Sequence, residues 1–498
     1  MKQTFLFLTL ATMLLSGCSK QEAILTGKIS GTAGSKTLVY TAPISETCYL
    51  GFTDTLQVDD TGSFEVKFAI TKPVFITLWT IEPYKQAKLL IEPGKSYDLV
   101  FEDEKDVQIS GQNEKGQMFL STLPNPSYVE MEGRSFIRDT SLLSIHENIE
   151  KLKQDDLNHL KELLERKEIS PVFFKRTEAD RNCYYASLET RILLIKTYPL
   201  IQKRSDEDLL KAGGNLFKKL EEIYSQYPPN DENLIISSFW SEYAEGYVTG
   251  YKQFSQPDFD MAKFSQMRQD ETIHAYMMHE STKYLTGKVL EFFQARYIHF
   301  IAYAHDDYEK ELITVFDRFQ KDYPQSQYAN YVAPLIEKIV AYHQIIEQPF
   351  SEEMKFMAHY EDINTLEEAV KQLKGKAIYI DVWATWCSPC KHEFQHNAAL
   401  KKILAENDIQ QLYISIDDDK REKRWENGIK YFHLTGTHIR ANKSLWNDLA
   451  KRFDKKNGAM LSIPWYILVD KNGNVLDEHA KSPSQLVTGE EFASKNKL

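Results

Sequence analysis

Hydrophobic and polar positions alternate with a period of two through the first part of the chain. The clearest run covers residues 64–70, where large apolar residues alternate with charged or small ones. Pro93 and Gly94 fit a type II turn, because proline presets the first φ angle and glycine tolerates the positive second one. Several short strands separated by such turns predict an all-β sandwich over residues 18–111.

Apolar residues change to helical spacing between residues 112 and 349. Ile145, Ile149 and Leu152 recur at intervals of three or four positions, with charged residues between them. A proline follows a tyrosine at three places where we expect helices to end, because proline disfavours helical geometry at the residue before it. These tyrosines are Tyr198, Tyr227 and Tyr323. Their uneven spacing argues against a regular repeat, so we expect a central all-α region.

Residues 350–498 mix short apolar strands with amphipathic helices. A β-prone run at residues 377–382 leads through a turn into a helical run. Further strands are predicted at residues 412–416, 465–469 and 475–478, and further helices at residues 365–373, 420–431 and 444–453. Parallel strands joined by helices, followed by an antiparallel hairpin, predict an α/β domain. With 498 residues, the chain is too long for one core and is expected to be multidomain.

The candidate chemistry begins where the apolar run at residues 377–382 ends. Residues 381–394 read Asp-Val-Trp-Ala-Thr-Trp-Cys-Ser-Pro-Cys-Lys-His-Glu-Phe. Cys387 falls at a predicted helix N-terminus, where unpaired N–H groups and the helix dipole stabilise a thiolate. Cys390 follows one turn later and can close a disulfide with Cys387. Two cysteines at this spacing are a weak signal alone, but the strand-turn-helix context strengthens it.

The stretch from Trp383 to Cys390 resembles the active site of the thioredoxin superfamily. Its flanks are similar to those of the extracytoplasmic, membrane-anchored TlpA/ResA-like branch. The resemblance implies a thioredoxin-like fold for residues 350–498 and a redox-active disulfide between Cys387 and Cys390. The residues that flank this pair are Trp383, Trp386, Ser388 and Pro389.

The same resemblance assigns catalytic roles to three further residues. Asp381 matches a buried carboxylate under the second cysteine, and Glu393 matches a glutamate kept beside the active site. Pro464 matches the cis-proline that faces the cysteine pair. The chain departs from the family at Gln395, where a proline often kinks the helix, so the resemblance leaves the shape of this helix open.

The implied reaction is thiol-disulfide exchange, in which Cys387 attacks a substrate disulfide and Cys390 resolves the mixed disulfide. Cys390 then needs a base. Asp381 is the first candidate, because burial raises the pKa of a carboxyl group toward neutrality. Glu393, one helical turn beyond Cys390, is the second. Pro389 before the second cysteine resembles the reducing members of the superfamily, which indicates a reductase or isomerase.

Residues 1–17 are expected to be a lipoprotein signal peptide. The segment has a positive start and a short apolar core, and Leu-Ser-Gly-Cys at residues 15–18 resembles the lipobox of bacterial lipoproteins. Cys18 is then the lipidation site, although an ordinary secretory signal is the alternative. Ser19 resembles the residue that directs such proteins to the outer membrane. We therefore expect a lipid-anchored envelope protein, in the outer membrane and facing the periplasm.

The composition narrows the range of expected partners. A net charge of -12 argues against nucleic acid as a binding partner. Of the five cysteines, lipidation and the redox pair leave Cys48 and Cys183, which we expect to be buried structural thiols, with a bridge between them as the alternative. We expect no cofactor and no metal. The expected partners are oxidised extracytoplasmic proteins, as substrates, and a membrane electron donor.

Other functions fit the sequence less well. A zinc site would use Cys387, Cys390, His392 and His396, whose helical positions do not converge on one point. A peroxiredoxin would need a lone peroxidatic cysteine. The main alternative is a tethered binding or redox-sensing lipoprotein whose thioredoxin-like domain is a docking module, because the large helical region has no assigned role.

Overall fold

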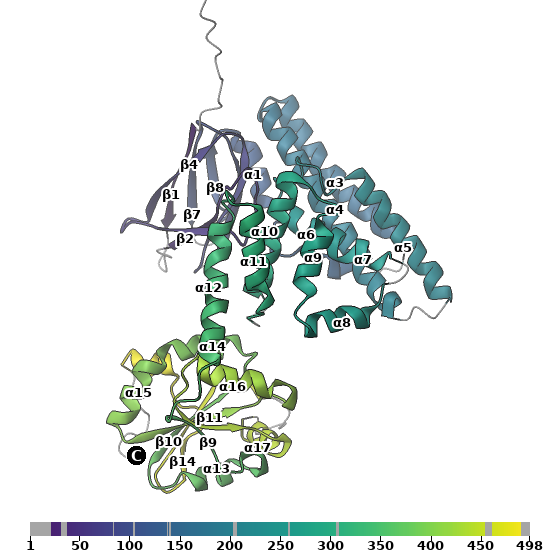
Figure 1. The fold of residues 1–498 in the computed structure, drawn as a ribbon. Coiled ribbons are helices and arrows are strands. Elements are labelled where there is room, and N and C mark those ends of the chain that lie inside the picture. The colour runs from purple at the N-terminus through teal and green to yellow at the C-terminus, as the bar shows by residue number, and fades with distance from the viewer. Residues whose placement is uncertain are drawn as a thin grey trace, which may run out of the picture. The chain divides into compact units, whose positions relative to one another are not determined.

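The structure is a computed structural model that describes residues 21–30, 37–82, 84–102, 105–136, 138, 141–202, 207–256, 259–304, 308–453 and 461–489. The chain divides into two compact units, Met1–Ile339 and Val340–Leu498. Each unit is visible in Figure 1 and has its own hydrophobic core. Cys18 lies outside the described residues, so its lipidation stays a prediction.

Two four-stranded sheets form a sandwich in the first unit. Their orders are β4-β1-β7-β8 and β3-β2-β5-β6. The strands are β1 (Gln21–Ser30), β2 (Thr37–Thr41), β3 (Thr53–Gln57), β4 (Ser63–Ile70), β5 (Val74–Thr80), β6 (Lys85–Ile91), β7 (Ser96–Glu102) and β8 (Gln108–Gly111). Leu25 and Leu99 from one sheet pack with Ile76 and Leu89 from the other in one buried core. The predicted β-sandwich is therefore present.

The turn between β6 and β7 shows how local sequence directs this sandwich. The N–H of Lys95 donates to the carbonyl of Glu92 at 3.2 Å, and Gly94 between them has a φ of 70°. A type II turn requires such a positive angle, which glycine adopts without a steric cost. The turn predicted at Pro93 and Gly94 is confirmed.

Helices make up the rest of the first unit. They are α1 (Glu114–Thr122), α2 (Val129–Gly133), η1 (Arg134–Phe136), α3 (Leu142–Glu165), α4 (Pro171–Gln202), α5 (Glu207–Gln226), α6 (Trp240–Glu245), the π-helical η2 (Gly246–Tyr251), α7 (Lys252–Phe254), α8 (Met261–Gln269), α9 (Ile273–Ser281), α10 (Gly287–Ala304), α11 (Glu311–Asp322) and α12 (Ala329–Ile346), which continues into the second unit. Helices α5 and α11 end before Tyr227 and Tyr323, as predicted.

The predicted helix end at Tyr198 is wrong, because α4 continues through Pro199 to Gln202. A proline inside a helix removes one backbone hydrogen bond and crowds the preceding turn. Here the helix ends soon after Pro199, so the proline disturbs its last turns and leaves the longer part of α4 intact. A proline therefore indicates that a helix ends nearby, but it does not show at which residue the helix ends.

The sheets and the helices of the first unit share buried contacts. Phe75 and Leu90 from the sandwich pack with Leu120, Leu160 and Phe173 from helices α1, α3 and α4. The boundaries predicted at residues 111 and 349 stay predictions, since the structure separates only the two larger units.

A six-stranded sheet is the centre of the second unit. Its order is β14-β13-β10-β11-β12-β9, in which β10, β11, β12 and β9 are parallel and β13 and β14 are antiparallel to their neighbours. The strands are β9 (Met354–Phe356), β10 (Ala377–Trp383), β11 (Ile409–Ser415), β12 (Gly436–Arg440), β13 (Trp465–Val469) and β14 (Val475–Asp477). This order is the predicted α/β arrangement, closed by the predicted hairpin.

Helices cover both faces of this sheet (Figure 1). They are η3 (Tyr360–Asp362), α13 (Leu366–Gln372), α14 (Ser388–Glu393), η4 (Phe394–His396), α15 (Asn397–Glu406), η5 (Asp419–Arg421), α16 (Glu422–Tyr431), α17 (Lys443–Phe453) and α18 (Pro483–Val487). Ile378, Ile380 and Val382 of β10 face α13 and α17, whereas alternate residues of β10 face α14, α15 and α16. The predicted fold class, with a β region, a helical region and an α/β domain, is confirmed.

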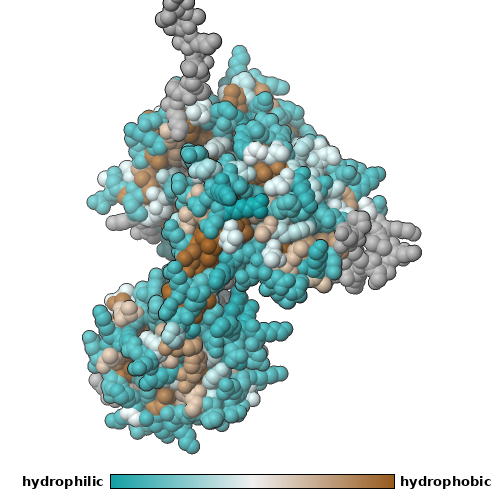
Figure 2. Space-filling model, in the orientation of Figure 1, coloured by the Kyte–Doolittle hydropathy of each residue, from teal (hydrophilic) through white to brown (hydrophobic). Residues whose placement is uncertain are grey.

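The face of the molecule in Figure 2 is largely hydrophilic, with apolar side chains gathered in limited patches. This surface agrees with a composition in which 27% of residues are charged. Among the helices that the structure describes, none combines the length and apolarity needed to cross a bilayer.

Candidate active site

Strand β10 carries the candidate site to the C-terminal edge of the parallel strands. All seven of its residues are buried, which explains the near-continuous apolar run in the sequence. Residues of β10 alternate between the two faces, so Asp381 and Trp383 lie on the face that α14 and α15 cover. The chain then turns at Ala384 and enters α14 at Ser388.

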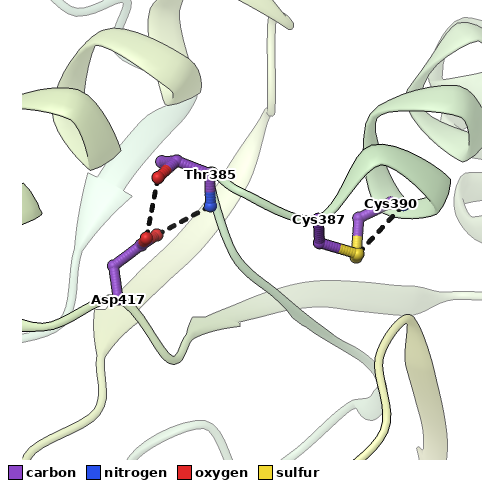
Figure 3. The surroundings of a disulfide bond; sticks show 4 residues. All are labelled: Thr385, Cys387, Cys390 and Asp417. Atoms are coloured by element: carbon purple, nitrogen blue, oxygen red, sulfur yellow. Dashed lines mark hydrogen bonds between the residues drawn. A yellow bond between two sulfur atoms is a disulfide. The ribbon is translucent and has the colours of Figure 1, made fainter. Parts of the chain in front are cut away.

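Cys387 occupies the N-cap position of α14 and is joined to Cys390 by a disulfide (Figure 3). The carbonyl of Cys387 accepts the N–H of Lys391, and its Sγ accepts the N–H of Cys390 at 3.2 Å. Cys387 keeps 4% of its surface exposed and Cys390 keeps none. Cys387 thus lies at a helix N-terminus, as predicted from the sequence, and that position is expected to favour its thiolate after reduction.

Asp417 anchors the loop before Cys387, and the sequence did not single it out. Its carboxylate accepts the N–H of Thr385 at 2.9 Å and the hydroxyl of Thr385 at 2.7 Å (Figure 3). The hydroxyl of Ser415 donates to the same carboxylate at 2.8 Å. Asp417 lies just past β11 at the edge where the parallel strands end, next to a predicted strand. An acidic residue at that edge was the available signal.

Asp381 is fully buried, and neither of its carboxyl oxygens has a hydrogen-bond partner within the described part of the chain. In the sheet it lies beside Tyr413 of β11 and opposite Tyr466 of β13. Burial raises the pKa of Asp381 well above its usual value, and the negative charge of Glu393 raises it further. A carboxyl group whose neutral form is favoured therefore lies on the face of β10 that α14 covers.

Glu393 is held by the start of α18. Its carboxylate accepts the N–H and the hydroxyl of Ser484, both at 2.9 Å. Ser484 lies in the first turn of α18, where N–H groups lack helical partners and favour an anion. Glu393 is thus a fixed neighbour of Asp381. No pattern in the sequence indicated Ser484 as the partner of Glu393, because 91 residues separate the two.

The helix after the cysteines is broken where the resemblance left its shape open. Helix α14 ends at Glu393, a 3₁₀ turn covers Phe394–His396, and α15 begins at Asn397. Gln395 lies in that turn, so the change of helix type occurs without a proline. Phe394 packs on Trp383 with ring centroids 5.2 Å apart, and this contact holds the turn against the site.

The flanking residues divide into buried and exposed ones. Trp383 is fully buried, whereas Trp386 is 52% exposed next to Cys387. Ser388 and Pro389 begin α14, where proline suits the first helical turn because its missing N–H has no partner there. The peptide between Ile463 and Pro464 is cis, and Ile463 packs against the cluster that contains both cysteines. The structure therefore brings the segment that contains Pro464 to the cluster that includes the pair.

Two further cysteines among the described residues belong to the first unit. Cys48 and Cys183 are free and buried in the first unit. Burial raises the pKa of Cys48 to about 11, so its thiol stays protonated at neutral pH. They are the buried thiols that the sequence predicted. No group of three or more His, Cys, Asp or Glu side chains in the described ranges is arranged to hold a metal ion.

A disulfide at a helix N-cap, above a buried carboxyl group and beside a cis-proline, defines the class of thioredoxin-like oxidoreductases. The redoxin family matches residues 360–491. The chain is 25% identical over 117 residues to the thiol-disulfide oxidoreductase ResA of Bacillus thuringiensis, which covers 24% of this chain and 62% of that protein. It is 32% identical over 60 residues to ResA of Bacillus subtilis, covering 12% of this chain and 34% of the relative.

A solution structure of a thiol-disulfide oxidoreductase from Bacteroides vulgatus is 35% identical, with 25% of this chain and 75% of that chain covered and a TM-score of 0.21. The chain spans somewhat less than two thirds of the first curated relatives, 62% of their length. The redoxin match and the curated relatives place the C-terminal part of the chain in the thioredoxin superfamily, as a TlpA/ResA-like domain. The resemblance seen in the sequence is confirmed.

Proposed function

We propose that the protein is a membrane-tethered thiol-disulfide oxidoreductase that reduces or isomerises disulfides of extracytoplasmic proteins. The observation that carries this proposal is the disulfide between Cys387 and Cys390 at the N-cap of α14. Cys387 has a sulfur that accepts an N–H and a small exposed surface, while Cys390 is fully enclosed. This asymmetry suits one sulfur for attack and the other for resolution.

The reaction transfers two electrons from the reduced cysteine pair to the substrate. Cys387, deprotonated, attacks one sulfur of a substrate disulfide, and the other substrate sulfur leaves as a thiolate. Cys390 then loses its proton and attacks Cys387, which breaks the mixed disulfide and releases the second substrate thiolate. Both substrate thiolates take protons from solvent. The Cys387–Cys390 disulfide is reduced again by a membrane electron donor, which supplies two electrons and two protons.

Asp381 is the proposed base for Cys390. It lies on the face of β10 that α14 covers, and Trp383 on the same face packs in one cluster with Cys390. The raised pKa of Asp381 suits proton exchange near neutral pH, since burial disfavours its charged form. Glu393 is the proposed second carboxylate, and its two bonds from Ser484 hold it in place.

The substrate is expected to approach over the exposed edge of the site. Trp386 offers an apolar surface beside Cys387, and the backbone at the cis peptide before Pro464 is where we expect an extended substrate segment to pair. Cys18, as the lipidated residue, would tether the chain to the outer membrane facing the periplasm. We retain the predicted domains at residues 18–111, 112–349 and 350–498, after a signal peptide at residues 1–17.

Cysteine variants test the proposed reaction. Cys390→Ser should accumulate mixed disulfides with extracytoplasmic proteins in the native host, because the resolving sulfur is gone. The matched control, Cys387→Ser with Cys390→Ser, should trap none. Purified protein with a dithiol reductant should turn over an oxidised, unfolded substrate. Stoichiometric binding without turnover would instead support a tethered binding or redox-sensing module.

The tether has its own test. Cys18→Ala should move the protein from the membrane fraction to the soluble fraction and abolish labelling by a lipid precursor. Cys48→Ala is the matched control, because this buried thiol has no role in the anchor. Retention of the Cys18→Ala variant in the membrane fraction without lipid label would reject the lipoprotein assignment and leave the thiol chemistry untouched.

A further inference from the structure

Four residues connect the end of β10 at Trp383 to the start of α14 at Ser388. Two backbone bonds shape this loop: Trp383 accepts the N–H of Ile416 at 2.9 Å, and Ala384 accepts the N–H of Cys387 at 3.1 Å. Thr385 joins the loop to Asp417, which lies just past β11, through its backbone N–H and its hydroxyl. Thr385 is thus tied down two positions before the nucleophile.

The buried carboxylate of Asp417 holds this loop through hydrogen bonds. The side chain is 1% exposed and accepts bonds from the N–H and hydroxyl of Thr385 and from the hydroxyl of Ser415 (Figure 3). Ser415 also accepts the N–H of Asp417 at 3.1 Å, which fixes the direction of the carboxylate. Hydrogen bonds from three donors to one carboxylate are charge-assisted, and such bonds are stronger and more directional than bonds between neutral groups.

The position of Cys387 depends on this loop. Its sulfur accepts the N–H of Cys390 at 3.2 Å, and such a bond weakens steeply when its geometry is disturbed. The helix N-terminus also acts over a short range, within the first turn. A loop that shifts relative to α14 would therefore raise the energy of the Cys387 thiolate.

We propose that Asp417 is a positioning residue for the nucleophile, which acts through Thr385 to hold Cys387 at the N-cap of α14. Asp417 touches neither sulfur and takes no proton in the reaction. This inference rests on the thiol-disulfide function proposed above, and it adds two residues, Asp417 and Thr385, to the machinery that sets the reactivity of Cys387.

Two hydroxyl deletions separate positioning from general packing. Thr385→Val and Ser415→Ala each remove one hydroxyl donor from Asp417, but only the first removes a bond between Asp417 and the loop, where the N–H of Thr385 remains as the other bond. Thr385→Ser keeps the donor. The measurement is the pH profile of Cys387 alkylation by iodoacetamide in the reduced, full-length protein, followed by peptide mass spectrometry. Thermal unfolding of each variant reports any general loss of stability.

Thr385→Val is expected to move the alkylation profile of Cys387 upward by about half a pH unit, which slows alkylation about threefold at pH 6, since the thiolate is the reacting species. Thr385→Ser should restore the wild-type profile, and Ser415→Ala should leave it in place. If Thr385→Val does not fold, Thr385→Ala deletes the same hydroxyl and should give the same shift.

Equal shifts in Thr385→Val and Ser415→Ala would overturn the proposal, because the effect would then follow the packing of Asp417 and not the loop. An unchanged profile in Thr385→Val would overturn it as well. The readout does not use turnover. A wild-type protein that fails to reduce protein disulfides, but shows the shift in Thr385→Val, would reject the proposed function and leave the positioning role standing.

Discussion

Two fully buried aspartates, one in each compact unit, reach opposite electrostatic states. Asp180 of the first unit accepts Lys88 at 2.8 and 2.9 Å, Arg181 at 2.8 Å and the hydroxyl of Ser237 at 2.7 Å. Asp381 of the second unit has no hydrogen-bond partner in the described residues. Equal burial therefore accompanies a favoured charged form in Asp180 and a favoured neutral form in Asp381.

The pKa directions express this difference. Burial opposes the ionisation of Asp180, but Lys88 and Arg181 outweigh it and lower the pKa of Asp180 below its usual value. Burial acts on Asp381 without a compensating cation, and Glu393 adds a like charge, so the pKa of Asp381 is raised. A buried carboxylate with all its partners is structural, whereas one without partners can exchange a proton.

The cysteines of the two units differ in the same way as the two aspartates. Cys48 and Cys183 are buried without a helix N-terminus at the sulfur, and burial raises the pKa of both. Cys387 has an N–H donor at its sulfur and lies at the N-cap of α14. Both units thus contain buried acids and thiols, and the local partners decide which of them are reactive.

The largest expected effect is on the ion pair of the first unit. Lys88→Met should lower the free energy of unfolding by about 3–5 kcal/mol, because it leaves a buried charge without its main partner. Urea unfolding measures this loss. The double variant Lys88→Met with Asp180→Asn should recover part of it, and the alkylation of Cys387 should be unaffected. A loss below about 1 kcal/mol would show that the pair is worth no more than a surface ion pair.

The pH dependence of the two aspartates should have opposite signs. Asp180 stabilises the fold above the usual aspartate pKa, and this contribution is lost as the pH falls through its lowered folded value. Asp381 acts the other way: stability falls as the pH rises from the usual aspartate pKa through its raised folded value. Asp381→Asn should remove that loss at every pH above the usual aspartate pKa, as urea unfolding at several pH values will show.

Native thiols should differ by about a hundredfold or more in alkylation rate, because rate follows thiolate population and access. At pH 6 to 7, Cys387 of the reduced protein should react first and Cys390 more slowly. Cys48, with its pKa raised to about 11, should react only after unfolding. Peptide mass spectrometry of a time course distinguishes these sites. Faster modification of Cys390 than of Cys387 would reverse the assignment of nucleophile and resolving cysteine.

Asp381→Asn should slow resolution of the mixed disulfide about ten- to a hundredfold, toward the low end of general-base effects. Attack by Cys387 should be largely spared. Single-turnover assays that follow formation and decay of the mixed disulfide separate the two steps. Glu393→Gln should slow decay less, and the double variant should cost less than the product of both effects if one proton path serves both. If neither substitution changes the rate at which the mixed disulfide decays, solvent takes the proton of Cys390.

The smallest expected effect is at the anchor of Glu393. Ser484→Ala removes one of two bonds to this carboxylate and should cost about 0.5–1.5 kcal/mol of stability. Urea unfolding at pH 7 measures the loss, and Ser484→Thr, which keeps the hydroxyl, is the matched control. Equal stability of both variants and the wild type would mean that the backbone N–H alone holds Glu393.

Much of the candidate site was predictable because it is local in sequence. Asp381, Cys387 and Cys390 lie in one strand-turn-helix segment, and the N-cap position of Cys387 follows from its neighbours. Asp417 and Ser484 were not predictable in the same way. They meet their partners across 32 and 91 residues, so nothing near them in the sequence identifies the contact.

The same division runs through the fold. Strand alternation, the turn at Pro93 and Gly94 and the three regions follow from local periodicity and backbone sterics, which act over a few residues. Lys88, by contrast, is a charged residue in an apolar strand, and its neighbours in the sequence do not show what pairs with it. Its partner Asp180 is 92 residues away in the sequence and meets it only in the folded protein. Short-range geometry specifies which elements form. The charge state of a buried group depends on which other groups are buried beside it. Those neighbours can be far away in the sequence, so only the packing of the folded chain decides it.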